Sequence, residues 1–226
     1  IICMKAAVKT AEKGISLMHQ NLQAGMTEEE LWSILHKTNI ENGGEWFETR
    51  LLNSGPKTNP WFQECNNRII QKGDIVAFDT DMVGPYGYCA DISRTFVEGR
   101  KLSNYQKKIH SLAYENVKYN EQLIKPGISF REFAEKAWKL PENCFSNHYP
   151  CQIHGVGMSD EWPFIAYPDK DYTNGDYSGI FEENMVVCVE SYIGEEDGSE
   201  GAKLEDQYLV KKNGLEKLSS LPLDLV

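Results

Sequence analysis

The chain has 226 residues, of which 41% are hydrophobic, and a formal net charge of −11 at pH 7. This length and composition are sufficient for one large domain with a hydrophobic core. The acidic balance argues against nucleic acid or an anionic membrane surface as a partner. The sequence contains no apolar run of about 18 residues, so it predicts no membrane-spanning helix.

The N-terminus and the cysteines indicate the expected cellular setting. The first residues, IICMKAAVKTAEKG, are typical of an amphipathic helix rather than of a signal peptide. Six cysteines are scattered along the chain without a Cys-x-x-Cys pair, which favours a reduced, cytoplasmic protein. Because the sequence begins with Ile1 rather than Met, we expect it to be the C-terminal part of a longer protein whose N-terminal domain is absent.

Hydrophobic spacing predicts the helices and strands along the chain. Helices are expected at residues 3–22, 27–42, 103–124 and 129–140. Strands are expected at 47–52, in two segments joined by a turn between 74 and 96, at 185–194 and at 202–214. Thr27 with Glu30, and Ser129 with Glu132, have the spacing of helix N-caps. A Gly/Asp/Tyr-rich stretch at 171–180 predicts a loop.

Two stretches about 100 residues apart resemble each other. LQAGMTEEEL (22–31) and IKPGISFREF (124–133) each combine the end of a helix, a glycine and the capped start of a second helix. A repeat at this separation predicts two similar αβ halves, about 1–101 and 102–226, within the single domain 1–226. Chance similarity is the alternative, because a helix that ends in glycine before a new cap is common.

Three carboxylates interrupt the strand-like stretch DIVAFDTDMVGPYGYCADISRTF (74–96). Asp79 and Asp81 are two residues apart, so on a strand they would share a face, and the turn can bring Asp91 beside them. Carboxylates held together repel one another unless a cation lies between them. A solvated polar face is the ordinary interpretation for a pair of aspartates, and a metal site is the alternative.

Further polar residues lie in apolar, strand-like surroundings: His154 in CQIHGVG, Glu190 in VVCVES and Glu205 in KLEDQYLV. Glu205 is expected on the strand face opposite Leu204. For one buried acid a salt bridge is the commoner explanation, but few basic residues lie near these segments, and Arg94 is the only one in the first motif. Oxygen ligands with one imidazole favour two ions such as iron, manganese or cobalt over a cysteine-based structural zinc site.

These motifs, in this order, resemble the Asp-Asp-His-Glu-Glu signature of the pita-bread metallohydrolases, which include methionine and Xaa-Pro aminopeptidases, prolidase and creatinase. The resemblance covers nearly the whole chain. It implies an α+β pita-bread fold, with two pseudo-symmetric αβ halves around a central dinuclear metal site. It also implies metal ligation by residues that match the signature: Asp79 or Asp81, Asp91, His154, Glu190 and Glu205.

Two departures from the peptidase pattern separate this chain from the peptidases. Trp61 follows the loop NSGPKTNPW where they have a histidine, and Asp160 in HGVGMSDEWP stands where they have a second histidine. Both substitutions are similar to the dimethylsulfoniopropionate lyases of this fold, the DddP type. That resemblance implies two metal ions, most often iron with manganese, cobalt or zinc as alternatives, and Asp160 as catalytic base. It implies six metal ligands, Asp79, Asp81, Asp91, His154, Glu190 and Glu205.

The expected chemistry is a metal-assisted β-elimination that releases dimethyl sulfide and acrylate from a sulfonium carboxylate. Metal binding to the carboxylate acidifies the adjacent carbon, and Asp160, if desolvated, would remove the proton. Tyr149, Trp61 and Trp162 are candidates for holding the sulfonium by cation–π contact. In the ordinary interpretation, the two tryptophans are core aromatics and Asp160 caps a turn.

Two other functions are compatible with the sequence. The ligand set also suits an Xaa-Pro-type metalloaminopeptidase that binds its oxyanion with other residues. A non-catalytic pita-bread binding protein is the second alternative, although all six candidate ligands are present. Family members are commonly homodimers, so a homodimer with a small-molecule substrate is expected. His19, His36, His110 and His148 are interpreted as surface or core residues.

Overall fold

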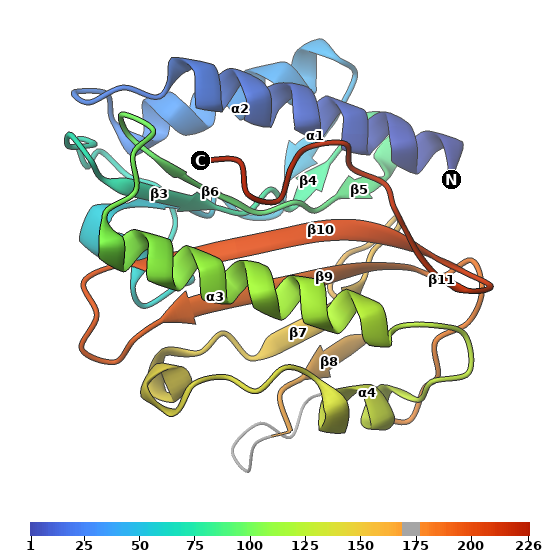
Figure 1. Cartoon of the computed structure of the whole chain (residues 1–226). Coiled ribbons are helices and arrows are strands. Elements are labelled where there is room, and N and C mark those ends of the chain that lie inside the picture. Colours follow the sequence, from blue (N-terminus) through green and yellow to red (C-terminus); the bar gives the residue numbers. More distant parts are fainter. Residues whose placement is uncertain (169–176) are drawn as a thin grey trace.

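Two helices, α1 (Ile2–Asn21) and α2 (Glu28–Glu41), cover the N-terminal strands in the computed structural model, which describes residues 1–168 and 177–226 (Figure 1). The predicted capping box of α2 is confirmed: Thr27 Oγ1 accepts from Glu30 N, and Glu30 Oε2 accepts from Thr27 N. These two bonds satisfy backbone donors that the first turn of the helix leaves unpaired.

The N-terminal strands are shorter and more numerous than the sequence predicts. They form two three-stranded sheets with the orders β2-β3-β6 and β1-β4-β5. Their bounds are β1 (Trp46–Phe47), β2 (Leu52–Ser54), β3 (Ile75–Phe78), β4 (Met82–Val83), β5 (Cys89–Ala90) and β6 (Arg94–Val97), with 3₁₀ turns η1 (Gly55–Thr58) and η2 (Pro85–Gly87). The expected single strand over 47–52 is therefore wrong.

The two-strand prediction for 74–96 is also wrong, because the chain leaves one sheet at Asp79 and enters the other at Met82. Thr80 fixes this crossing, since its hydroxyl donates to Ala90 O at 2.8 Å and accepts from Ile92 N at 2.9 Å. Asp81 has a φ of 35°, a left-handed conformation that no strand contains. Aspartate is a poor strand former, so the breaks fall where the acids are.

The C-terminal half contains a five-stranded antiparallel sheet with the order β11-β10-β9-β7-β8. Its strands are β7 (Cys151–Gly155), β8 (Phe164–Ala166), β9 (Val186–Gly194), β10 (Gly201–Lys211) and β11 (Gly214–Lys217). The prediction for β9 is confirmed; the strand predicted over 202–214 is present as β10 but ends at Lys211, where the chain turns into β11. In the loop prediction for 171–180, residues 171–176 lie outside the described residues.

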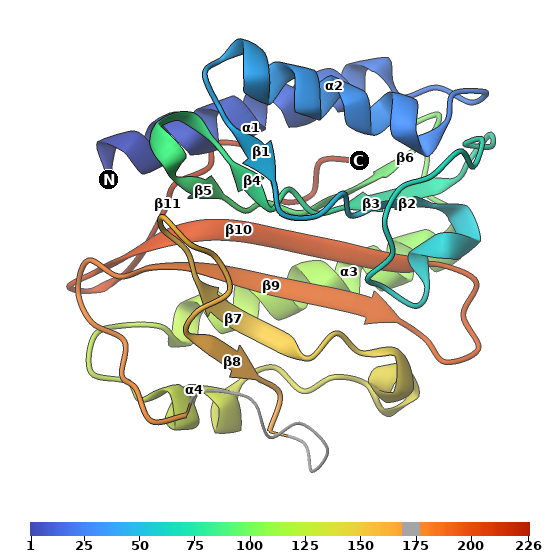
Figure 2. The same cartoon turned by 180° about the vertical axis from the view of Figure 1, so that it is seen from behind.

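Helix α3 (Asn104–Asn120) crosses the front of β9 and β10 in Figure 1 and lies behind them in Figure 2. Its predicted continuation to 124 is instead the 3₁₀ turn η3 (Glu121–Leu123). Helix α4 (Phe130–Lys136) begins after the predicted cap Ser129 but ends before residue 140, because Trp138 N donates to Asn120 Oδ1 at 2.8 Å. A further 3₁₀ turn, η4 (Glu142–Asn147), leads to β7.

Each half has its own hydrophobic core. Side chains of α1, α2 and the N-terminal strands form one core, and side chains of α3, α4 and the C-terminal sheet form the other. The chain end returns to the first core, where Leu218, Leu221 and Leu225 are partly buried. None of the helices in the described part of the chain is both long and apolar enough to cross a membrane.

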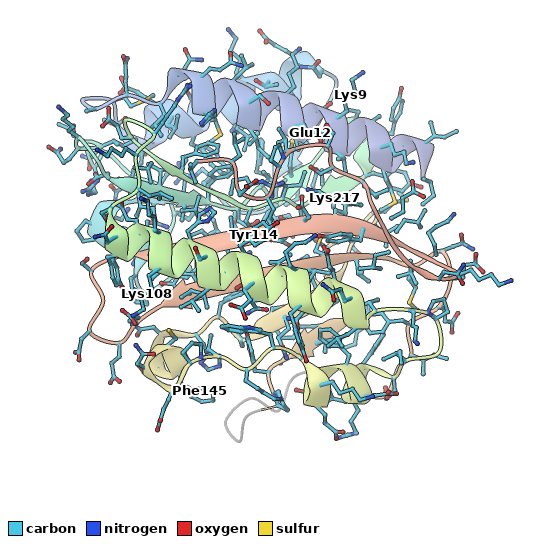
Figure 3. All side chains as sticks on the ribbon, viewed as in Figure 1. Lys9, Glu12, Lys108, Tyr114, Phe145 and Lys217 are labelled. Atoms are coloured by element: carbon cyan, nitrogen blue, oxygen red, sulfur yellow. The ribbon has the colours of Figure 1, made fainter. Side chains whose placement is uncertain are left out.

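Polar contacts attach the C-terminal segment to the N-terminal half. Glu12 on α1 accepts from Ser219 Oγ and Leu221 N, both at 3.1 Å, and Figure 3 shows it beside this segment. The buried Arg94 guanidinium donates to Glu205 O at 2.6 Å, to Asp206 Oδ1 at 2.8 Å and to Leu221 O at 3.1 Å. Arg94 therefore joins β6, β10 and the chain end.

We expect Arg94→Leu to lower the free energy of unfolding by about 3 kcal/mol, the lower end of the range for breaking a buried ion pair. The lower end applies because Lys217 Nζ still contacts Asp206 Oδ2 at 2.7 Å. Urea denaturation measures the change. The control Lys5→Met removes an exposed pair with Glu216 and should cost less than about 1 kcal/mol; an equally small loss in Arg94→Leu would contradict the prediction.

Candidate metal centre

The two breaks in the N-terminal strands bring three acids together. Asp79 and Asp81 lie between β3 and β4, and Asp91 follows β5. Their carboxylate oxygens lie within 4.8 Å of one another, and all three side chains are buried. Asp81 N donates to Asp91 Oδ1 at 3.2 Å, and Thr49 Oγ1 donates to Asp81 Oδ2. The predicted convergence is confirmed, but a loop crossing rather than a shared strand face produces it.

Antiparallel register places the remaining candidates on one face of the C-terminal sheet. Glu190 on β9 pairs with Glu205 on β10, and His154 on β7 pairs with Cys188 on β9. Alternate residues of a strand share a face, so Cys188 lies beside Glu190 on β9. Two further clusters of possible ligand atoms result, one of Asp91, His154, Cys188 and Glu205, the other of Asp79, Glu190 and Glu205.

The two ring nitrogens of His154 contact different carboxylates. Nε2 lies 3.0 Å from Glu205 Oε1, 3.6 Å from Asp91 Oδ2 and 3.7 Å from Glu190 Oε1. Nδ1 lies 3.2 Å from Asp160 Oδ1, and the Asp160 side chain is only 2% exposed. The structure therefore brings Asp160 to the six candidate ligands, where it can orient the imidazole so that Nε2 points to the acids.

Lys203 is a cation of the centre that sequence reasoning missed. It is fully buried, and its ammonium lies 2.7 Å from Asp79 Oδ2 and 2.8 Å from both Glu190 Oε2 and Glu205 Oε2. The expectation that few basic residues lie near these acids therefore missed a direct ion-pair partner. Lys203 lies two residues before Glu205 on the same strand, and that spacing was the available signal. Arg94, the basic residue noted in the sequence, bonds Asp206 instead.

Ser93 is a second missed residue. Its hydroxyl contacts Asp79 Oδ1 at 2.7 Å and Glu205 Oε2 at 2.8 Å, and Lys203 Nζ donates to it at 2.9 Å. Glu205 N also donates to Ser93 O at 3.1 Å. These bonds join the N-terminal and C-terminal parts of the centre. Serine is too common in loops for the sequence alone to have indicated this role.

The acids are not charge-balanced by the protein alone. Burial raises the pKa of Asp81 and Asp91 well above the usual range, and the neighbouring Asp79 carboxylate raises both further. Burial also raises the pKa of Glu190 to about 7. Burial would raise the pKa of Glu205 as well, but Lys203 and His154 outweigh it and lower that pKa. Closely packed acids of this kind release protons when a cation binds.

The carboxylate oxygens and the imidazole of the centre are suitable ligands for two divalent metal ions. Glu190 Oε1 and Asp160 Oδ2 are buried without a hydrogen-bond partner among the described residues. Buried polar oxygens without partners are uncommon unless an ion or water satisfies them. The Asp79, Asp81 and Asp91 cluster could hold one ion. The cluster of Asp91, His154, Cys188 and Glu205 could hold the second ion. Its donors are carboxylate oxygens and one imidazole, with the Cys188 thiol beside them.

We expect the metal-free protein to become more stable on acidification from pH 8 to pH 6. The pKa of Glu190 is raised from 4.5 to about 7 in the folded state. Its stabilising contribution is therefore complete below about pH 4.5 and is lost as the pH rises through about 7. Raised pKa values act in the same direction at Asp81 and Asp91. Melting temperatures of chelator-treated protein measure the trend, and a fall towards pH 6 would contradict it.

An aromatic pocket of about 430 Å³ shares two of its lining rings with the surroundings of Lys203. Trp61 and Tyr149 line it, and Lys203 Nζ lies 5.9 Å and 5.6 Å from the centroids of these two rings. Phe62 stacks on Tyr149 with centroids 5.8 Å apart. Trp162 is 65% exposed and is not part of this lining. His148, interpreted from the sequence as a surface or core residue, also lines the pocket.

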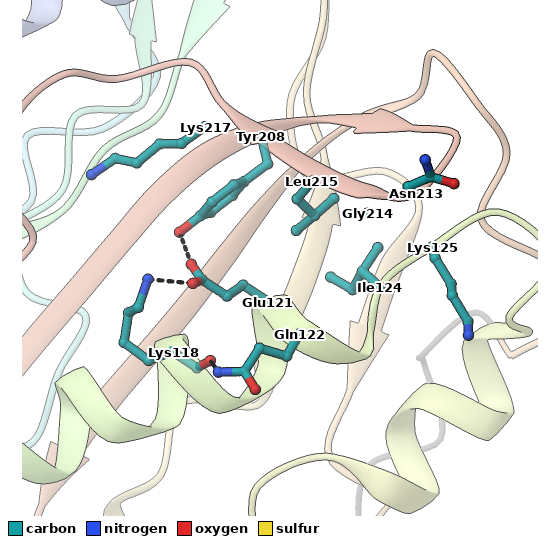
Figure 4. Close-up of a pocket in the computed structure, with 10 residues that line it drawn as sticks. All are labelled: Lys118, Glu121, Gln122, Ile124, Lys125, Tyr208, Asn213, Gly214, Leu215 and Lys217. Atoms are coloured by element: carbon teal, nitrogen blue, oxygen red, sulfur yellow. Dashed lines mark hydrogen bonds and ion pairs between the residues drawn. The ribbon is translucent and has the colours of Figure 1, made fainter.

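A second pocket, of about 360 Å³, lies on the other face of β10 (Figure 4). Tyr208 lines it and donates to Glu121 Oε2 at 2.7 Å, and Lys118 also pairs with Glu121. Tyr208 shares its strand face with Leu204, whereas Glu205 points to the opposite face. This pocket is therefore separated from the acids by the sheet.

Comparison with known proteins matches nearly the whole chain to one protein family. Residues 2–212 match metallopeptidase family M24. The chain is 42% identical to a protein of Roseovarius nubinhibens named dimethylsulfoniopropionate lyase DddP, over 99% of the chain and 51% of that protein. It is 43% identical to the protein of the same name in Roseobacter denitrificans, over 87% of the chain and 44% of that protein. The chain thus spans about half the length of these curated relatives.

Solved structures confirm the pita-bread, α+β architecture. The prolidase from Pyrococcus furiosus superposes with a TM-score of 0.83 over 97% of this chain and 63% of that chain. The sequences are 24% identical, so this similarity concerns the fold.

Proposed function

The chain belongs to metallopeptidase family M24, and we propose that within it this protein is a metal-dependent carbon–sulfur lyase. Its proposed reaction cleaves dimethylsulfoniopropionate to dimethyl sulfide and acrylate. The observation that carries the proposal is Asp160, whose Oδ1 contacts His154 and whose Oδ2 is buried without a hydrogen-bond partner among the described residues. The names of the two relatives at 42% and 43% identity support it.

The metal ions would be held by six residues of the centre, Asp79, Asp81, Asp91, His154, Glu190 and Glu205. Bound ions would supply Lewis acidity that draws charge from the substrate carboxylate and acidifies the adjacent carbon. The protein fixes the ligands beforehand, since Ser93 bonds Asp79 and Glu205 while Asp160 bonds His154. Preformed geometry of this kind reduces the reorganisation needed when the substrate binds.

Asp160 is the proposed base. Its Oδ2 would take the proton from the carbon next to the substrate carboxylate. The electron pair of that C–H bond forms the carbon–carbon double bond of acrylate, and the C–S bond breaks with its electrons leaving on dimethyl sulfide. The carboxyl side chain is 2% exposed, so bulk water has little access to the proton transfer.

The aromatic pocket is the proposed site of the sulfonium group. Aromatic ring faces attract cations, including onium groups. Trp61 and Tyr149 wall the pocket and also lie beside the Lys203 ammonium, so a sulfonium here would be adjacent to the acids. Trp162, two residues after Asp160, is assigned to the outer rim of the site because it is exposed.

The proposal extends to the metal and to the cellular setting. Iron is the proposed metal, because oxygen donors with one imidazole suit it and the resemblance to the lyase branch implies it. All six cysteines are free in the structure, which supports a reducing, cytoplasmic location. A homodimer is proposed on the resemblance to the family.

An Xaa-Pro peptidase is the second candidate, and one observation favours it. His148 lines the pocket beside Tyr149, and an imidazole there could donate a hydrogen bond to a developing oxyanion. A non-catalytic protein is disfavoured, because the six candidate ligands are buried and brought together.

Parallel assays on iron-loaded protein test the proposal. Dimethyl sulfide is measured in the headspace after addition of dimethylsulfoniopropionate, beside hydrolysis of an Xaa-Pro dipeptide. The lyase proposal predicts sulfide release and no dipeptide cleavage. Dipeptide cleavage without sulfide would overturn it in favour of the peptidase. Metal binding without either reaction would favour the binding protein.

A further inference from the structure

Lys203 occupies one of the three clusters of metal-ligand atoms. Its ammonium contacts one oxygen from each acid of the Asp79, Glu190 and Glu205 cluster, at 2.7 to 2.8 Å. The three hydrogens of the ammonium serve Asp79 Oδ2, Glu205 Oε2 and the Ser93 hydroxyl, and Glu190 Oε2 contacts the ammonium as an ion pair at 2.8 Å. The Trp61 and Tyr149 rings lie 5.9 Å and 5.6 Å away.

The acids divide their oxygens between Lys203 and the other two clusters. Glu205 gives Oε2 to Lys203 and Oε1 to His154. Glu190 gives Oε2 to Lys203, while its Oε1 lies 3.7 Å from His154 Nε2 and has no hydrogen-bond partner in the described part of the chain. A fixed cation therefore takes one cluster, and two clusters that share Asp91 remain for metal ions.

The charges of the six ligands and Lys203 balance those of two divalent ions; the Asp160 carboxylate, which contacts His154 Nδ1 and belongs to none of the clusters named above, lies outside this count. The five carboxylates of the six-ligand set carry five negative charges, His154 is neutral as a ligand, and Lys203 returns one positive charge. Four negative charges remain, equal to the charge of two divalent ions. Without Lys203 the ligand set would carry one negative charge more than two divalent ions neutralise. Asp81 adds one negative charge to the five-ligand signature, so Lys203 offsets that addition.

We propose that Lys203 is a built-in counter-charge that offsets Asp81 and makes the centre selective for two divalent ions. The inference rests on the proposed metal centre but not on the reaction. Lys203 is thus a positioning residue, whose ammonium fixes three ligand oxygens and the net charge of the ligand set. Removing it should shift the preference towards ions of higher charge, because a buried negative charge binds a trivalent ion more strongly than a divalent one.

The experiment compares metal affinities of the metal-stripped chain. Mn²⁺ binding is followed by electron paramagnetic resonance and Tb³⁺ binding by luminescence, and the ratio of the two dissociation constants is the readout. Lys203→Met should shift this ratio towards Tb³⁺ by at least about tenfold, a modest part of the Coulomb energy of a close charge pair. Lys203→Arg retains the charge and should stay near the wild-type ratio.

Two further variants make the test specific. Asp81→Asn should shift the ratio away from Tb³⁺, and Lys203→Met combined with Asp81→Asn should restore it towards the wild-type value. The matched control is Lys217→Met, which removes a lysine bonded to the buried Asp206 at 2.7 Å, outside the metal clusters. Its ratio should not change.

An unchanged ratio in Lys203→Met, or no restoration in the double variant, would overturn the counter-charge. If Lys203→Met does not fold, Lys203→Gln takes its place, and an unchanged ratio in that variant would equally overturn the counter-charge. None of these readouts uses sulfide release. A protein without lyase activity that shows the expected ratios would overturn the proposed function and leave the counter-charge standing.

Discussion

Asp160→Asn is expected to lower sulfide release from dimethylsulfoniopropionate by about 10²–10⁴-fold, the usual contribution of a general base. Asparagine keeps an oxygen that can contact His154 Nδ1, which lies 3.2 Å from Asp160 Oδ1 and also 3.2 Å from Gly155 O. It cannot take up a proton at the second oxygen. Metal content should therefore stay at the wild-type level, which metal analysis of the purified variant checks beside the headspace assay.

Asp160→Ala is the companion variant, because it removes both the base and the side-chain oxygen that contacts His154 Nδ1, and leaves only Gly155 O of these two acceptors. Loss of such an outer hydrogen bond commonly weakens metal binding by about 10–100-fold. We therefore expect Asp160→Ala to lose activity and to bind metal more weakly than Asp160→Asn. If Asp160→Asn retains activity and only Asp160→Ala loses it, Asp160 positions His154 and the base lies elsewhere.

His154→Ala is expected to reduce sulfide release to background and to remove at least one metal ion per chain. Nε2 of His154 is the nitrogen donor of the cluster with Asp91 and Glu205, and it lies 3.0 to 3.7 Å from three carboxylates. Without it the cluster keeps oxygen donors and the buried Cys188 thiol, a weaker ligand set for a borderline metal ion. Elemental analysis after dialysis against buffered metal measures the loss.

His110→Asn is the control for that variant. His110 lies on α3, is 5% exposed and is absent from the three metal clusters. Its substitution should leave the metal content unchanged, whatever it does to stability. Two ions per chain in His154→Ala would contradict the assignment of His154 as a ligand.

Short motifs predicted the centre better than the strands that carry it. Asp79, Asp81 and Asp91 were selected as acids in an apolar stretch, and they converge. The strands around them were predicted as one hairpin, whereas the chain passes between two sheets. Local alternation cannot show which sheet a two-residue strand joins, because long-range pairing decides it. Helix caps are local, and the prediction for Thr27 and Glu30 was correct.

Residues whose role depends on distant partners were not predictable in the same way. Lys203 was overlooked because a lysine on a strand is usually solvated, although its position two residues before Glu205 places both on one face. Ser93 contacts Asp79 and also Glu205, which lies 112 residues further along the chain, and only the packing of the two halves creates the second contact. The base role of Asp160 and the sulfonium contacts stay predictions, since geometry alone does not test them.

The most direct test of the proposed elimination is proton NMR of the products that iron-loaded protein forms from dimethylsulfoniopropionate. Removal of the proton from the carbon beside the carboxylate predicts acrylate and dimethyl sulfide in equal amounts from the first turnover. The vinyl protons of acrylate identify the product. Sulfide accompanied by 3-hydroxypropionate in place of acrylate would show hydrolytic displacement and would contradict the account.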